Sequence, residues 1–106
     1  MSYQVTLLPE ARRELATIFT WLSNRSPQGA QSWFNRFSEV LLTLEDAPLS
    51  FGLAPESEFA NREVRQLIFK TKRGRRYRAL FTVSDDTVHV LHIRGPGQDL
   101  VEPHDV

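Results

Sequence analysis

The chain has 106 residues, 13 basic and 13 acidic side chains, and a formal net charge of zero. Its length fits one domain over residues 1–106, and 41% hydrophobic residues fit a globular protein rather than a disordered one. It has no cysteine, which excludes disulfides, cysteine-bound zinc and a cysteine nucleophile. The N-terminus shows no signal-peptide pattern, and no apolar run approaches the roughly 20 residues of a membrane span. We therefore expect a cytoplasmic protein without membrane contact.

The first 46 residues predict a short strand and two amphipathic helices. Residues 3–7 alternate between polar and apolar side chains, as a strand does. Pro9 then suits the first position of a helix, and Ser26-Pro27 supplies the N-cap and first residue of another. Each helix carries one apolar stripe with helical spacing: Ala11, Leu15, Ile18, Phe19 and Leu22 in the first; Ala30, Trp33, Phe34, Phe37, Leu41 and Leu44 in the second. We expect an antiparallel helical hairpin, with Trp21 and Trp33 as core or packing residues.

The rest of the chain predicts a loop and three consecutive strands. Residues 47–61 contain three helix-breaking or turn residues and are expected to form a loop. Residues 63–70, 75–84 and 87–94 are rich in β-branched and aromatic residues. In the middle strand, alternation predicts a core face with Tyr77, Ala79, Phe81 and Val83, and a second face with Arg76, Arg78, Leu80 and Thr82. The polar tail, residues 98–106, is expected to fray.

This order, β-α-α-β-β-β, predicts an α+β fold in which a helical hairpin packs on one face of a small, mostly antiparallel sheet. The charge is unevenly distributed over it. Residues 62–94 hold nine basic and three acidic side chains, a net of +6, which the acidic remainder balances. The strand region is therefore expected to meet a phosphate-rich or acidic partner.

Several segments, in this order and spacing, carry a resemblance to a known family. They are residues 5–11 (VTLLPEA), Ala30 with Trp33, Leu44 with Ala47-Pro48, residues 63–67 (EVRQL), residues 77–81 (YRALF) and residues 88–94 (VHVLHIR). Over nearly its whole length the chain resembles the RelE/ParE superfamily of type II toxin–antitoxin toxins, also called plasmid stabilisation proteins. The resemblance implies a toxin held inactive by a small acidic antitoxin, with operator DNA contacted only through that antitoxin.

The two branches of this superfamily imply different activities. RelE-like toxins cleave mRNA on the ribosome, and ParE-like toxins inhibit DNA gyrase. RelE-like catalysis uses basic sheet residues, one of which matches Arg78, and an Arg or a His-Tyr pair after the last strand. Here Gln98 stands at that Arg position, and Tyr3 and Tyr77 are the only tyrosines. These departures favour ParE-like inhibition of gyrase or another protein. A metal-independent mRNA endonuclease and a degenerate, non-toxic relative remain as alternatives.

Candidate site residues follow from the chemistry of RNA cleavage, which needs a base, an acid and a cation at the phosphate. Arg65 and Arg78 are the candidate phosphate-binding catalytic residues. His92 is the third candidate catalytic residue, because a histidine in an ordinary environment titrates near neutral pH. A second group is expected to bind phosphate or an acidic partner: Lys70, Lys72, Arg76 and Arg94. The alternative is a solvated face whose charges prevent aggregation. His89 and His92 are three apart on a strand and should face opposite ways, so neither a metal site nor a cofactor is expected.

Overall fold

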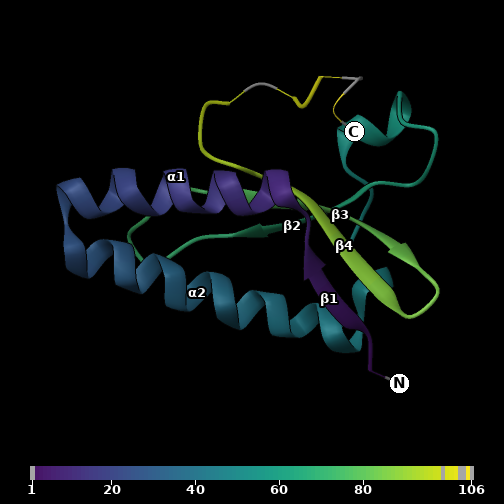
Figure 1. Ribbon diagram of the computed structural model, residues 1–106, viewed down its shortest axis with the longest axis horizontal. Helices are drawn as coiled ribbons and strands as arrows, with labels where there is room; N and C mark the ends of the chain where they lie inside the picture. Colours follow the sequence, from purple (N-terminus) through teal and green to yellow (C-terminus); the bar gives the residue numbers. More distant parts are fainter. Residues whose placement is uncertain (1, 99, 103–104, 106) are drawn as a thin grey trace.

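The structure, a computed structural model, describes residues 2–98, 100–102 and 105 (Figure 1). Its elements are β1 (Gln4–Leu7), α1 (Pro9–Arg25), α2 (Pro27–Asp46), the short 3-10 helices η1 (Pro48–Ser50) and η2 (Pro55–Glu58), β2 (Arg65–Phe69), β3 (Tyr77–Ser84) and β4 (Thr87–Arg94). This confirms the predicted α+β order. Strands β2 and β3 each begin two residues later than predicted, so Arg75 and Arg76 precede β3.

The two helices form the predicted hairpin, and a single residue joins them. The Ser26 hydroxyl accepts a hydrogen bond from the Gly29 N–H at 3.0 Å, which caps the first turn of α2. Trp33 is buried, as predicted. Trp21 is 52% exposed, so of the two expected roles it is not a core residue. Its neighbours Ile18 and Leu22 pack against the main core, whereas the Trp21 ring lies under the Arg25 guanidinium at the surface.

The four strands form one mixed sheet in the order β1-β4-β3-β2. β1 runs parallel to β4, and the other neighbours are antiparallel. The main core lies between the helices and one sheet face, where Phe37 of α2 packs with Phe69 and its neighbours. The predicted core face of β3 is confirmed: Ala79 and Phe81 are fully buried, and Tyr77 and Val83 pack at the edge of the cluster.

The opposite face of the sheet is also covered over part of its length. A second apolar cluster there contains Ala54, Val64, Leu80, Leu91 and Val101. Leu80 and Thr82 are therefore buried rather than open to solvent. Figure 1 shows the yellow C-terminal segment returning toward the teal loop between α2 and β2. Within the tail that is expected to fray, Val101 is only 3% exposed; residues 99, 103–104 and 106 lie outside the described part.

A β-bulge in β4 changes which side chains share a face. Leu80 pairs with His92, whereas Phe81 pairs with Val90, so Leu91 is the extra residue. His89 pairs with Thr82, and His92 with Leu80. The two histidines therefore lie on the same face, and the prediction of opposite faces is wrong. The described residues contain no group of three side chains suited to holding a metal ion. No helix in the described chain is long and apolar enough to cross a membrane.

Candidate functional site

The three predicted catalytic residues do not lie on one face of the sheet. Arg65 pairs with Phe81, which faces the helices. Arg78 pairs with Ile68 and with Arg94, on the face turned away from the helices. Since cross-strand partners share a face, Arg65 points to the opposite side from Arg78. The two candidate phosphate-binding arginines therefore lie on opposite faces of the sheet, because alternation along β2 turns Arg65 toward the core side.

The Arg78 guanidinium is held by a buried carboxylate from η2. Its Nη1 donates to Glu56 Oε1 at 2.8 Å and its Nη2 to Glu56 Oε2 at 2.5 Å, a bidentate pair. Gln66 Oε1 accepts a further bond from Nη1 at 3.2 Å. Glu56 is fully buried and also accepts the Val101 N–H at 3.0 Å. This carboxylate joins the loop after α2, the middle strand and the tail at one point.

The charge state of Glu56 follows from these bonds. Burial by itself raises the pKa of the Glu56 carboxyl, but the hydrogen bonds from Arg78 and from the Val101 N–H outweigh it and lower the pKa below its usual value. Glu56 is therefore ionised at neutral pH and neutralises Arg78 inside the protein. The positive charge that the sequence places on this strand is, at Arg78, largely cancelled by an internal partner.

Arg65 is engaged on the helix side of the sheet. Its Nη1 donates to the Phe51 carbonyl at 2.6 Å, and its Nη2 lies 3.3 Å from the exposed Glu63 carboxylate. Phe51 in turn contacts Phe81 edge to face, with ring centroids 6.0 Å apart. Arg65 thus anchors the loop after α2 to the start of β2, which is a structural role.

His92 is buried between α1 and the tail. Its Nδ1 lies 3.3 Å from both carboxylate oxygens of Glu14, and its Nε2 lies 2.7 Å from the Asp105 carbonyl oxygen. The Glu14 bond raises the pKa of His92; burial opposes this and the Asp105 carbonyl supports it. Glu14 also accepts the Ile93 N–H at 2.9 Å, and its Oε2 lies 3.9 Å from Arg94 Nη1. Both ring nitrogens of His92 therefore face acceptors, so the imidazolium form fits this site best.

The cations of the β2–β3 hairpin differ from these residues. We call five of them the hairpin cations: Lys70, Lys72, Arg73, Arg75 and Arg76. All five are exposed, and none forms an ion pair with a carboxylate within the described ranges. Arg76, which was predicted on the outer face of the middle strand, precedes that strand and projects from the hairpin. Their charge is therefore free to act on a partner.

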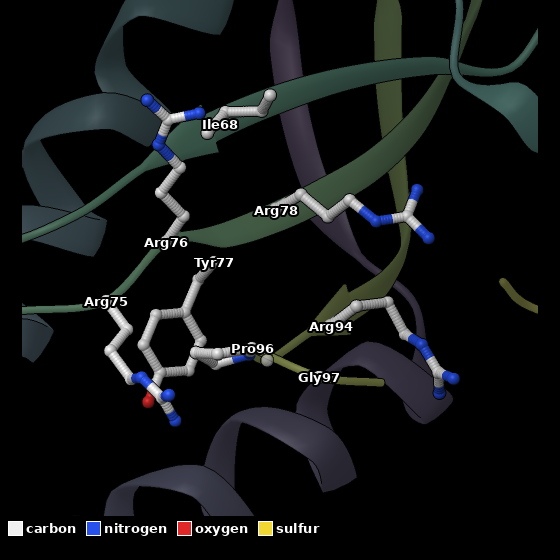
Figure 2. Close-up of a pocket in the computed structure, with 9 residues that line it drawn as sticks. Ile68, Arg75, Arg76, Tyr77, Arg78, Arg94, Pro96 and Gly97 are labelled. Carbon is white, nitrogen blue, oxygen red and sulfur yellow. The ribbon is translucent and has the colours of Figure 1, made fainter. Parts of the chain in front are cut away.

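A cavity of about 410 Å³ lies where the hairpin cations meet the sheet. Its lining includes Ile68, Arg75, Arg76, Tyr77, Arg78 and Arg94. In Figure 2 the Arg76 guanidinium lies beside Ile68, whereas Arg78 and Arg94 extend together in another direction. The four arginines therefore do not converge on one point. Burial raises the pKa of the Tyr77 phenol, which makes it a poor base at neutral pH.

Two acidic residues central to this geometry, Glu14 and Glu56, were not predicted as site residues. Glu56 and Glu58 stand two apart in the same turn and look equivalent in the sequence, yet Glu56 is fully buried and Glu58 is exposed. No local pattern marks either partner, because Glu56 bonds a residue 22 positions away and Glu14 one that is 78 positions away.

Comparison with known proteins identifies the family. No curated protein and no solved structure gives a significant match. The family described as the ParE toxin of the type II toxin–antitoxin system, parDE, matches residues 5–100. The match includes both helices, strands β2 to β4, all of β1 except its first residue, the hairpin cations and the Glu56–Arg78 pair. The chain therefore belongs to the ParE toxin family of type II toxin–antitoxin systems, and membership implies a cognate antitoxin.

Proposed function

We propose that this toxin acts by binding a protein target, with DNA gyrase as the first candidate, and that its cognate antitoxin blocks this binding. The observation that carries the proposal is the bidentate bond between Arg78 and the buried Glu56. It supports a binding role because the arginine best matched to RelE-like catalysis is committed to an internal carboxylate. Inhibition of gyrase is the activity that resemblance to ParE-like toxins implies.

The chemistry of RNA cleavage argues against the enzymatic alternative. A catalytic cation acts through donors that are preorganised toward the charge developing in the transition state. For Arg78 to serve a phosphate in this way, it must leave Glu56 uncompensated in the interior, at a cost of about 3–5 kcal/mol. Arg65 lies on the other face, and both ring nitrogens of His92 are occupied. The described residues do not present an assembled acid, base and cation.

A ribosome-dependent mRNA endonuclease is the second candidate, and one observation favours it. The cavity lined by Arg75, Arg76 and Arg94 brings several guanidinium groups to one end of the sheet. Guanidinium groups suit phosphate binding. On this alternative, the hairpin cations hold the RNA backbone, and binding displaces Glu56 from Arg78.

The decisive experiment compares two activities of the same purified protein. We expect inhibition of gyrase supercoiling and no codon-positioned cleavage in a translation-coupled mRNA assay. Both assays are repeated after adding the product of the adjacent small open reading frame, which is expected to restore supercoiling. Robust codon-positioned cleavage by the wild-type protein contradicts the proposal and favours the endonuclease. If the protein shows neither activity and cells that express it grow normally, it is a non-toxic relative.

The antitoxin is expected to be small, acidic and partly disordered until it binds. The basis is the family membership together with the net charge of +6 over residues 62–94. Co-expression with the neighbouring open reading frame should yield a complex that survives purification and dissociates more readily at high salt. A neighbour that does not co-purify contradicts this expectation.

A further inference from the structure

A second cavity adjoins the first at the end of α1. It has a volume of about 440 Å³, and its lining includes Ile18 and Trp21 of α1, Arg75, Tyr77 and Pro96. It shares Arg75, Tyr77 and Pro96 with the 410 Å³ cavity. The two cavities therefore adjoin along these residues, and together we call them the Trp21–Arg75 groove.

The two ends of the groove differ in chemistry. One end is apolar, formed by Ile18 and the half-exposed Trp21. Arg25 lies over the Trp21 ring, with its guanidinium carbon 4.1 Å from the ring centroid, and this contact holds the indole at the surface. The other end carries Arg75 and Arg76, which have no carboxylate partner among the described residues. A ligand that complements the groove needs a bulky apolar group next to negative charge.

We propose that the Trp21–Arg75 groove binds an acidic peptide segment of the toxin's protein target. A bulky apolar side chain of that segment lies beside Trp21, and its carboxylates lie on Arg75 and Arg76. This inference rests on the proposed function, which requires a target-binding surface on the toxin. Trp, Tyr and Arg are the residues that most often dominate the binding energy of protein interfaces, and the groove combines all three.

The geometry favours a peptide over a nucleic acid. Single-stranded nucleic acid binds by stacking bases on open aromatic faces. The Tyr77 ring is packed against Phe69, 5.9 Å away, and against Trp33, 5.2 Å away, while one face of Trp21 is covered by Arg25. A short run of carboxylates in a flexible peptide can instead reach Arg75 and Arg76 separately, which suits their different directions in Figure 2.

Binding can be measured directly by fluorescence anisotropy. The probe is a short labelled peptide of glutamates around one central Phe, compared with versions carrying Gln for Glu or Ser for Phe. We expect the first peptide to bind and both altered peptides to bind much more weakly. Trp21→Ala should weaken binding about 10- to 30-fold, as loss of an interface anchor does. Arg75→Gln should weaken it about 2- to 5-fold and reduce its salt dependence.

Matched control variants separate the groove from general effects on charge and apolarity. Leu42→Ala removes an equally exposed apolar side chain from α2, and Arg62→Gln removes a charge from the loop before β2. Both should bind the peptide like the wild type. Circular dichroism and thermal unfolding confirm that each variant is folded. No binding of the Glu–Phe peptide by the folded wild type, or tighter binding of a single-stranded oligonucleotide, overturns the proposal.

A gyrase supercoiling assay then tells whether the groove inference or the proposed function is wrong. If the wild type and both controls inhibit gyrase but Trp21→Ala and Arg75→Gln do not, the result supports the groove as the target-binding surface. Wild-type inhibition that all four variants keep overturns the groove and leaves the function intact. Absence of wild-type inhibition overturns gyrase as the target, and the peptide titration still decides the groove. Loss of antitoxin binding alone in Trp21→Ala assigns the groove to the antitoxin and overturns the inference.

Discussion

Besides the exposed Arg62 in the loop before β2, the basic stretch up to Arg94 contains two kinds of cation that look alike in the sequence. We call Arg65, Arg78 and Arg94 the inner arginines. They are partly buried, and each contacts an acidic side chain: Glu63, Glu56 and Glu14, respectively. The hairpin cations are exposed and have no such partner in the described residues. Local charge counts add the two kinds together, although only the second presents uncompensated charge to a partner.

Burial explains the difference. A guanidinium with little contact to water is costly unless it is paired and hydrogen-bonded, so Arg78, with 17% of its side chain exposed, has a bidentate partner. A hairpin tip keeps its charges in water and needs no partner. Partner-binding functions should therefore depend on the hairpin cations, and stability on the inner arginines.

The largest expected effect is on the inner pair. Arg78→Gln should destabilise the protein by about 3–5 kcal/mol, because it leaves the Glu56 carboxylate buried without its partner. This is a large part of a total stability of about 5–15 kcal/mol. Urea unfolding at pH 7 measures it. Replacing both partners, as in Glu56→Leu with Arg78→Met, should recover much of the loss.

The pH dependence of that pair has a defined sign. The pKa of Glu56 is lowered from 4.5, so its contribution is fully present above pH 4.5 and is lost as the pH falls through the lowered value. Equal stability of Arg78→Gln and wild type at pH 7 would show that the Glu56–Arg78 pair contributes nothing. Stability would then not distinguish the inner arginines from the hairpin cations.

A smaller effect is expected at His92. Its pKa is raised from 6.5, so its contribution is fully present below pH 6.5 and is lost as the pH rises through the raised value. At pH 6, His92→Gln should lower the free energy of unfolding by about 1.5–3 kcal/mol, the range for a hydrogen bond to a charged group. The loss should shrink at pH 9.

The matched control is His89→Gln, on the same strand and the same face of the sheet. The free energy of unfolding of this variant should differ between pH 6 and pH 9 by as much as that of the wild type. If His92→Gln keeps that difference too, the clamp formed by Glu14 and the Asp105 carbonyl does not hold an imidazolium.

A still smaller loss of stability is expected on replacing Arg65, another of the inner arginines. Arg65→Gln should cost about 1 kcal/mol, because it removes the bond to the Phe51 carbonyl. Glu63→Gln, which removes only an exposed carboxylate beside Arg65, should change stability by less than about 0.5 kcal/mol. Thermal unfolding of both variants measures this. Equal losses would show that the surface ion pair, and not the carbonyl bond, holds the loop.

The smallest effect on stability is expected at the hairpin. Arg75→Gln and Arg76→Gln should each change the free energy of unfolding by less than about 0.5 kcal/mol, because both side chains are exposed. Arg76→Gln is also the matched control for Arg78→Gln, two residues away. A loss above about 1 kcal/mol at Arg76 would remove the distinction between the two kinds of cation.

The sequence predicted much of the fold and little of the site. Pro9 and Ser26-Pro27 predicted where the helices start, and the apolar stripe of α2 predicted the burial of Trp33 and Phe37. These features are local, because helix caps and periodic apolar spacing act within a few residues. The site residues were chosen as cations on strands, although the alternation of Arg65 with the buried Leu67 and Phe69 already points Arg65 toward the core side.

By itself, the sequence determined the order of helices and strands, the helical hairpin and the core face of β3, because each depends on neighbouring residues. Tertiary structure alone decided the partners of Arg78 and His92, which lie 22 and 78 positions away. It also decided the bulge at Leu91, which brings His89 and His92 to one face. These outcomes depend on how distant segments pack. Burial then determines which charges are neutralised inside the protein and which remain for a partner.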